Sequence, residues 1–219
     1  MLLALIIRTP SSHPNTFNLI YSMTPPYKIV LLGDSSVGKT SLVHRFTTDS
    51  FDPHLANTIG AAFISKEHTA SNRSIKFEIW DTAGQERYKS LTPMYYRNSK
   101  VALVCFDMSL PDESFERARY WIEQLAILGP PDIKIKVVGN KEDLGADANL
   151  LMIQEFCGDR NLSLVTTSAK TGKGIVALFD QITDEIEQEF FDKYQEEQAA
   201  NTNDDRLLLN MRMKQTGCC

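Results

Sequence analysis

The sequence lacks a long apolar run, an excess of basic residues and a pattern of spaced cysteine pairs. No segment approaches the ~18 consecutive apolar residues that a membrane-spanning helix needs, so none is predicted. The chain holds 23 Lys and Arg against 28 Asp and Glu, and its formal net charge of −5 gives no general attraction to nucleic acid. The four cysteines, Cys105, Cys157, Cys218 and Cys219, suggest no disulfide framework, which indicates a reducing compartment.

What the sequence does contain is a complete phosphate-binding loop. Residues 33–40 read Gly-Asp-Ser-Ser-Val-Gly-Lys-Thr, after the apolar run 27–32 and before the amphipathic segment 41–46. In such a strand, glycine-rich turn and helix, backbone N–H groups and the helix N-terminus hold phosphate. A turn that binds nothing is the alternative, and the complete match in this context argues against it. Lys39 can reach the β- and γ-phosphates, and the Thr40 hydroxyl can bind Mg²⁺. The nucleotide-binding residues expected here are Asp34, Ser35, Ser36, Val37, Gly38, Lys39, Thr40 and Ser41.

Apolar periodicity predicts strands and helices that alternate along the chain. The continuous apolar run 101–106 is typical of a strand buried on both faces of a sheet. Alternation of this kind predicts one α/β domain with a mostly parallel, six-stranded sheet and helices on both faces. Strands are predicted at 27–32, 63–67, 75–80, 101–106, 133–138 and 162–166, and helices at 39–48, within 82–99, and at 111–128, 148–158 and 175–186.

Both ends of the chain are predicted to lie outside this domain, which we assign to residues 27–190. Residues 1–26 include four prolines, which interrupt regular elements, and are expected to be a disordered extension. Met23 stands just before the first strand and is an alternative start. A signal peptide is the other interpretation of the apolar residues 1–7, although no basic segment precedes them. Residues 191–219 are predicted to be a flexible tail.

A second polar segment follows the predicted strand 75–80 and reads Asp-Thr-Ala-Gly-Gln-Glu at 81–86. The Asp81 carboxylate can hold Mg²⁺, directly or through a water molecule. Gly84 permits close backbone approach to a γ-phosphate, and Gln85 can orient an attacking water. Thr58, in the preceding loop, can complete the magnesium sphere, and an ordinary loop hydroxyl is its alternative. The expected metal ligands are thus Thr40, Thr58 and Asp81, and the expected catalytic residue is Gln85.

Two further segments predict a site for a guanine base. Asn140-Lys141-Glu142-Asp143 closes a predicted strand, and an ionised Asp143 can accept hydrogen bonds from guanine N1–H and the 2-amino group. Adenine lacks both donors, and sites of this kind reject the wrong ligand by on the order of 10⁴-fold. A helix N-cap is the alternative role for Asp143. Ser168-Ala169-Lys170 follows the last strand, where a backbone N–H can donate to guanine O6.

Together these motifs resemble the small Ras-like GTPases and, within them, the Rab family. The resemblance covers residues 27–190 and the last two cysteines, and the alanines at 61–62 with Pro93-Met94-Tyr95-Tyr96-Arg97 look most like the endosomal Rab-five branch. It implies that Phe51 lies against the guanine ring and that loops 51–60 and 82–97 are two switches. The sequence departs from the family at Thr166, where glutamate is usual, and in segment 144–150, which is shorter.

The resemblance also implies partners and a membrane. Phe63 and Trp80 fall on the polar faces of neighbouring strands, and with Tyr95 they match a Rab aromatic triad that binds effectors. Packing beneath the switch loops is the alternative for these rings. Cys218 and Cys219 match the doubly geranylgeranylated C-terminus that the resemblance implies. Two lipid chains would anchor the protein stably to a membrane, whereas one chain would not. Two exposed thiols are the alternative.

The function implied by the resemblance is a monomeric GTP-binding and GTP-hydrolysing switch of endosomal vesicle traffic. It would bind GTP or GDP with Mg²⁺ and act on the cytoplasmic face of membranes, with a cytosolic pool. Its expected partners are effectors, a GTPase-activating protein, an exchange factor, and Rab escort and GDP-dissociation-inhibitor proteins. A nucleotide-loaded scaffold with little hydrolysis is one alternative, which Gln85 opposes. An ATP-using phosphate-loop enzyme is another, which Asp143 opposes.

Overall fold

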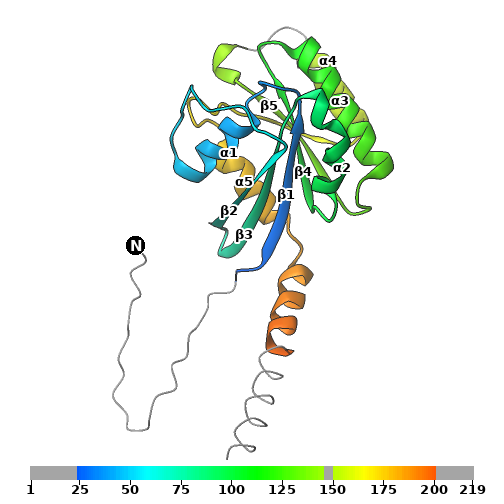
Figure 1. Ribbon diagram of the computed structural model, residues 1–219. Helices are drawn as coiled ribbons and strands as arrows, with labels where there is room; N and C mark the ends of the chain where they lie inside the picture. The colour runs from blue at the N-terminus through cyan, green and yellow to red at the C-terminus, as the bar shows by residue number, and fades with distance from the viewer. Residues whose placement is uncertain (1–23, 146–149, 201–219) are drawn as a thin grey trace, which may run out of the picture.

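The computed structural model describes residues 24–145 and 150–200. These residues form a six-stranded sheet with helices packed on both faces (Figure 1). Most of the predicted extension 1–26, and both Cys218 and Cys219, lie outside these residues. The strands are β1 (Pro26–Gly33), β2 (Ala61–Ala70), β3 (Arg73–Thr82), β4 (Val101–Asp107), β5 (Lys134–Asn140) and β6 (Ser163–Thr166). The helices are α1 (Lys39–Thr48), α2 (Thr92–Tyr96), α3 (Pro111–Leu128), α4 (Leu150–Asp159) and α5 (Ile175–Asp184), with short 3₁₀ helices η1 (Glu86–Leu91) and η2 (Glu142–Leu144).

The strands lie in the order β2-β3-β1-β4-β5-β6, which confirms the predicted architecture. Only β2 runs antiparallel to its neighbour within this sheet, and the other four pairings are parallel. The carboxyl ends of β1, β3, β4, β5 and β6 therefore meet at one edge. In open α/β sheets that edge is where ligands bind.

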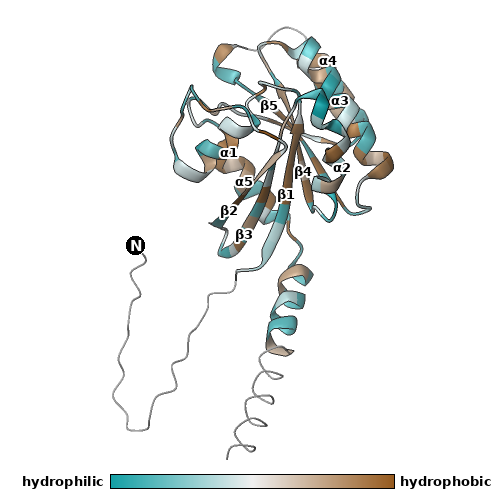
Figure 2. Cartoon of the chain, in the orientation of Figure 1, coloured by the Kyte–Doolittle hydropathy of each residue, from teal (hydrophilic) through white to brown (hydrophobic). Residues whose placement is uncertain are grey.

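Alternate residues of the central strands face two separate apolar layers. On one side Ile29 and Leu31 of β1 pack with Phe46 of α1 and Phe179 of α5. On the other side Val30 and Leu32 pack into a layer that includes residues of α2, α3 and α4. Figure 2 shows the resulting hydrophobic colour along β1 and β4. Because both faces of the strands are covered, the sheet is a rigid base for the loops at its carboxyl edge.

The hairpin between β2 and β3 is tighter than the sequence predicted. The strands predicted at 63–67 and 75–80 left residues 68–74 between them, whereas the structure pairs Ala70 with Arg73 and leaves two residues between the strands. Those residues, Ser71 and Asn72, have φ values of 49° and 62°. A two-residue turn with positive φ at both positions matches the right-handed twist of the strands that it joins. Because the turn is this short, β2 and β3 are both longer than the strands predicted from apolar alternation.

The segment after α5 contains a helix that the sequence analysis did not predict. The apolar stripe suggested a helix to Ile186, but α5 ends at Asp184 and residues 188–200 are again helical. The Phe190 ring meets Tyr27 of β1 at a centroid distance of 5.3 Å, and Arg73 Nη1 donates to the Ile186 carbonyl at 2.7 Å. These contacts fasten the new helix to the amino end of the sheet. Within the described parts of the chain, no helix is both long and apolar enough to cross a membrane.

The aromatic layer under α1 and α5 predicts a large loss of stability when one ring is removed. Phe179 is fully buried, stacks on Phe46 with ring centroids 3.5 Å apart, and lies 5.5 Å from Phe77. Phe179→Ala should lower the free energy of unfolding by about 3–5 kcal/mol, because the rigid sheet cannot collapse into the cavity. Urea denaturation measures this loss.

Val176→Ala is the matched control, because Val176 lies on the same helix and is 56% exposed. It should change the free energy of unfolding by less than about 0.5 kcal/mol. Equal effects of the two substitutions would contradict the assigned packing.

Candidate nucleotide-binding site

The turn between β1 and α1 has the backbone shape of a phosphate-binding loop. Gly33, Ser36 and Gly38 have φ values of 140°, 63° and 90°. A Cβ on Gly33 would lie 2.2 Å from the Cys105 carbonyl oxygen of β4, so only glycine fits there. The helix begins at Lys39, directly after Gly38. The unpaired N–H groups of the first turn of α1 therefore lie at the carboxyl edge of the sheet, where they can bind an anion.

Lys39 is buried along this turn. Its Nζ donates hydrogen bonds to the carbonyl oxygens of Gly33 at 3.0 Å and Asp34 at 2.7 Å. Burial lowers the pKa of Lys39, because removal from water disfavours the charged form. A neighbouring phosphate would favour the charged form and oppose that effect. The side chain is thus held beside the position that the motif assigns to β- and γ-phosphates.

Three oxygen-bearing side chains from separate segments meet at the start of α1. The Thr40 hydroxyl lies 2.7 Å from Thr58 Oγ1 and donates to Asp81 Oδ2 at 2.7 Å. Thr58 Oγ1 also donates to that oxygen, at 3.0 Å. Asp81 Oδ1 is buried and has no hydrogen-bond partner among the described residues. The structure therefore brings together all three side chains that the sequence predicted as metal ligands.

This donor set fits a magnesium ion. Mg²⁺ prefers hard oxygen ligands, and two hydroxyls with one carboxylate supply them. Burial raises the pKa of Asp81, although hydrogen bonds from Thr40 and Thr58 oppose the rise. A cation beside Asp81 would favour the ionised carboxylate and would satisfy its unpaired Oδ1.

A cavity of about 250 Å³ lies beside these ligands. Gly84, after β3, lies against the phosphate loop, since a Cβ there would lie 2.3–2.4 Å from backbone atoms of Asp34 and Ser35. Gln85 follows Gly84 and lines the cavity. The role predicted for it, orienting an attacking water, requires a position of this kind. The lining residues that the sequence predicted are Ser35, Ser36, Gly38, Lys39, Thr40, Ser41, Thr58, Gly84 and Gln85.

A second cavity, of about 300 Å³, shares Ser36, Gly38 and Ser41 with the first. Within it Asp143 is held by Ser168, whose Oγ donates to Asp143 Oδ1 at 2.6 Å. The other predicted residues on its wall are Phe51, Asn140, Lys141, Asp143, Ala169 and Lys170. Two adjoining cavities, one at a phosphate loop and one with a carboxylate, suit a nucleotide with its phosphates at one end and its base at the other.

Asn140 joins the walls of the two cavities. It is buried, and its Nδ2 donates to the Val37 carbonyl of the phosphate loop at 3.0 Å. Its Oδ1 accepts from the Ala169 N–H at 3.1 Å and from Thr167 Oγ1 at 3.3 Å. The Thr167 N–H also donates to β5 at 2.7 Å, so the loop after β6 is fixed although Thr166 stands where glutamate was expected.

Three of the predicted nucleotide-binding residues line neither cavity and support the wall instead. Asp34 Oδ1 accepts from the Ser35 N–H at 2.7 Å, Val37 is buried, and Ser168 holds Asp143. The sequence analysis missed Leu144 in the second cavity, for which the only signal was its place after Asp143. Four lining residues of the first cavity were predicted only as members of the switch loop 51–60 and not as site residues, namely Pro53, Leu55, Ala56 and Asn57.

Three aromatic side chains lie together beside the second predicted switch. Phe63 of β2 is paired with Trp80 of β3 in the sheet register, and their ring centroids are 5.5 Å apart. Tyr95 of α2 stacks on Trp80 at 5.6 Å. Phe63 is 53% exposed, whereas the other two rings are partly buried against the layer under α2 and α3. The three form one aromatic patch.

Comparison with known proteins agrees with this geometry. The model of the Ras family matches residues 28–188. GTP-binding protein YPT53 of Saccharomyces cerevisiae is 46% identical over 167 residues, covering 73% of this chain and 76% of that protein. GTP-binding protein ypt5 of Schizosaccharomyces pombe is 45% identical over 163 residues, covering 73% and 77%. Ras-related protein Rab-5A of Dictyostelium discoideum is 43% identical over 162 residues, covering 73% and 80%. The chain therefore belongs to the Ras family: it is a small GTPase, similar to the Rab-five branch, that binds GTP and hydrolyses it to GDP and phosphate.

Proposed function

We propose that this GTPase is a switch of endosomal membrane traffic whose two loops are controlled by Mg²⁺ and the γ-phosphate. The observation that carries the proposal is the meeting of Thr40, Thr58 and Asp81. Thr58 belongs to the loop after α1, and Asp81 is the next-to-last residue of β3, directly before the second predicted switch loop. A ligand from the first loop and a ligand at the start of the second would thus hold one ion beside the phosphate loop. Hydrolysis removes the γ-phosphate and releases such loops, so partners distinguish the two nucleotide states.

The base cavity supplies specificity for guanine in this proposal. Asp143 would accept from N1–H and the 2-amino group, and its hydrogen bond from Ser168 orients the carboxylate. Phe51 would cover one face of the ring. A backbone N–H of residues 168–170 would donate to O6. ATP offers adenine, which has neither donor for Asp143, and would leave that carboxylate without a hydrogen bond from the base.

Hydrolysis in this proposal depends on position and charge. Mg²⁺ held by Thr40, Thr58 and Asp81 would neutralise charge on the β- and γ-phosphate oxygens. Lys39 would hold the same phosphates, and the backbone at Gly84 would lie beside the γ-phosphate. Gln85 lines that cavity, so its amide can hold a water in line for attack.

The membrane and the partners follow from family membership and from similarity to the Rab-five branch. Members of this family work with effectors, GTPase-activating proteins, exchange factors and GDP-dissociation inhibitors. For this chain we propose that the effector surface includes Phe63, Trp80 and Tyr95, because large aromatic side chains are enriched among interface hot spots. We also propose that Cys218 and Cys219 carry prenyl groups that attach the protein to endosomal membranes.

Thr40→Asn tests the metal site. The amide cannot keep the hydroxyl's contacts with both Thr58 and Asp81, so Mg²⁺-dependent affinity for GTP should fall by tenfold or more relative to GDP. Affinities measured with and without Mg²⁺ give this ratio. Thr48→Asn, at the exposed end of the same helix, should leave the ratio unchanged. A wild-type ratio in Thr40→Asn would remove Thr40 from the metal site.

Gln85→Leu tests the catalytic assignment. Activating proteins speed hydrolysis in Ras by about 10⁵-fold, or about 7 kcal/mol of barrier. Leucine neither donates to nor accepts from water, so the variant should lose at least about 10²-fold of the stimulated rate. Its nucleotide affinity should stay within about twofold, because Gln85 has no assigned contact with base or phosphate. Single-turnover hydrolysis with an activating protein measures the rate, and equal stimulated rates would contradict the role of Gln85.

Phe63→Ala tests the effector surface. Truncation of a hot-spot ring costs about 2 kcal/mol or more, so affinity for a Rab-five effector domain should fall about 30-fold. Calorimetry of the GTP-loaded protein measures it. Nucleotide affinity should not change, since Phe63 lines neither cavity. Leu151→Ala, 68% exposed on α4, is the control and should bind the effector normally. Normal effector binding by Phe63→Ala would assign the ring a structural role only.

A further inference from the structure

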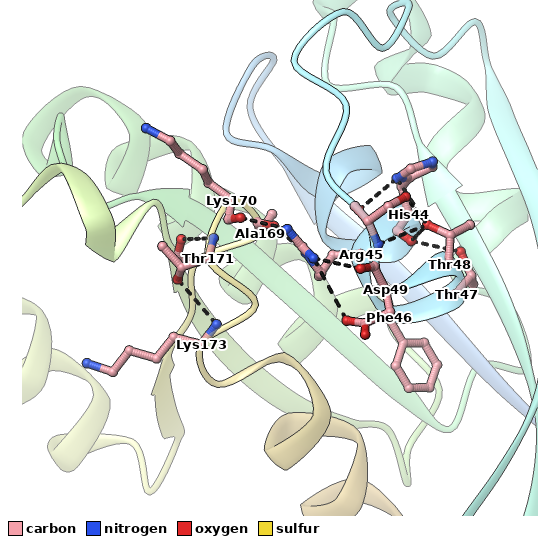
Figure 3. Close-up of polar contacts among 12 residues, drawn as sticks. His44, Arg45, Phe46, Thr47, Thr48, Asp49, Ala169, Lys170, Thr171 and Lys173 are labelled. Atoms are coloured by element: carbon pink, nitrogen blue, oxygen red, sulfur yellow. Dashed lines mark hydrogen bonds and ion pairs between the residues drawn. The ribbon is translucent and has the colours of Figure 1, made fainter.

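Arg45, on the last turn of α1, joins that helix to the loop of the base cavity (Figure 3). Its Nε donates to the Ala169 carbonyl at 2.8 Å, and its Nη2 donates to the Lys170 carbonyl at 2.6 Å. Its Nη1 donates to the Asp49 carbonyl at 2.8 Å. One guanidinium therefore holds three backbone carbonyls, one near it in sequence and two that lie 124 and 125 residues further along the chain. None of the motifs in the sequence includes this residue.

The hydrogen bonds to carbonyls, rather than an ion pair, make this contact specific. The Arg45 side chain is 15% exposed, whereas the Asp49 carboxylate, 3.8 Å from Nη1, is 98% exposed and contributes little. The stem of Arg45 lies against the loop, since a Cβ on Gly172 would be 3.8 Å from Arg45 Cδ. Only a planar guanidinium presents donors in several fixed directions.

The bond to Ala169 fixes the direction of a neighbouring N–H group. In a trans peptide the carbonyl of one residue and the N–H of the next point to opposite sides. Arg45 holds the Ala169 carbonyl, so the Lys170 N–H points away from Arg45. Ala169 and Lys170 line the base cavity, and Arg45 does not. The Lys170 N–H donates to no acceptor among the described residues, whereas the N–H of Ala169 donates to Asn140.

We propose that Arg45 is a positioning residue that turns the Lys170 N–H toward guanine O6. The proposal rests on the guanine role given above to the second cavity, and it adds which group reads O6 and what orients it. The next peptide supports the same orientation, because Arg45 also holds the Lys170 carbonyl and the Thr171 N–H donates to Ser168 Oγ at 3.1 Å. Ser168 in turn holds Asp143, so the O6 donor and the carboxylate belong to one bonded loop.

The experiment compares three nucleotides by competition with fluorescent GDP on the full chain. GDP carries both recognition groups, 6-thio-GDP replaces O6 with a larger and weaker sulfur acceptor, and IDP lacks the 2-amino group. The ratio of GDP to 6-thio-GDP affinity therefore reports the O6 donor, and the ratio of GDP to IDP affinity reports Asp143. A general loss of structure would lower both ratios, so the pair separates positioning from stability.

Arg45→Met should lower the ratio of GDP to 6-thio-GDP affinity by roughly fivefold to tenfold, the contribution of one hydrogen bond. It should leave the ratio of GDP to IDP affinity within about twofold of the wild-type value. Arg45→Lys, which retains the charge and much of the stem, should lower the first ratio similarly, because a single ammonium cannot hold the same carbonyls. Arg45→Lys decides the question if Arg45→Met does not fold. Asp49→Asn removes the exposed carboxylate while keeping a residue that tolerates positive φ, and it should change neither ratio.

Asp143→Asn should give the opposite pattern, a lower ratio of GDP to IDP and a retained preference over 6-thio-GDP. Arg45 variants that keep the wild-type preference over 6-thio-GDP, or that lose both ratios together, would overturn the positioning role. A wild-type protein that shows neither preference would instead contradict the guanine role of the cavity, which is a different failure.

Discussion

The side-chain amide of Asn140 is the contact on which the nucleotide site depends. It lies at the end of β5, is buried, and binds the phosphate loop through Nδ2 and the loop after β6 through Oδ1. A Cβ on Gly38 would lie 2.4 Å from Nδ2, so the phosphate loop can approach only because residue 38 is glycine. The parallel sheet brings the two loops to one edge, and this amide sets their spacing. A buried amide with both ends satisfied fixes such a spacing tightly.

The metal site and the aromatic patch are neighbours along one strand. Trp80 and Asp81 are consecutive residues of β3, and they pair with Phe63 and Ala62 of β2. Successive side chains of a strand point to opposite faces, so the ring and the carboxylate lie on opposite sides of the sheet. The proposed metal ligand and the patch are therefore joined by a single peptide unit, the shortest covalent connection that two side chains can have.

The sequence predicted the parts of the site that depend on side-chain chemistry at fixed spacing. Thr40, Thr58 and Asp81 lie far apart in the chain, yet strand ends and motif order were enough to bring them together in the prediction. The contacts of Arg45 could not be predicted, because the acceptors are carbonyls that every residue carries. The tight hairpin turn depends on backbone angles of Ser71 and Asn72 that their types permit without requiring. The helix at 188–200 carries three aromatic residues, Phe190, Phe191 and Tyr194, among mainly polar ones. It gains its position from contacts with Tyr27 and Arg73, which no local pattern reveals.

That helix and the phosphate loop lie at opposite ends of β1. β1 begins at Pro26 beside the helix and ends at Gly33 in the phosphate loop, and its eight residues span about 25 Å at ~3.3 Å each. Residues 188–200 thus lie at the end of the sheet opposite the phosphate loop. The two cavities at the carboxyl edge are separated from this helix by the length of β1.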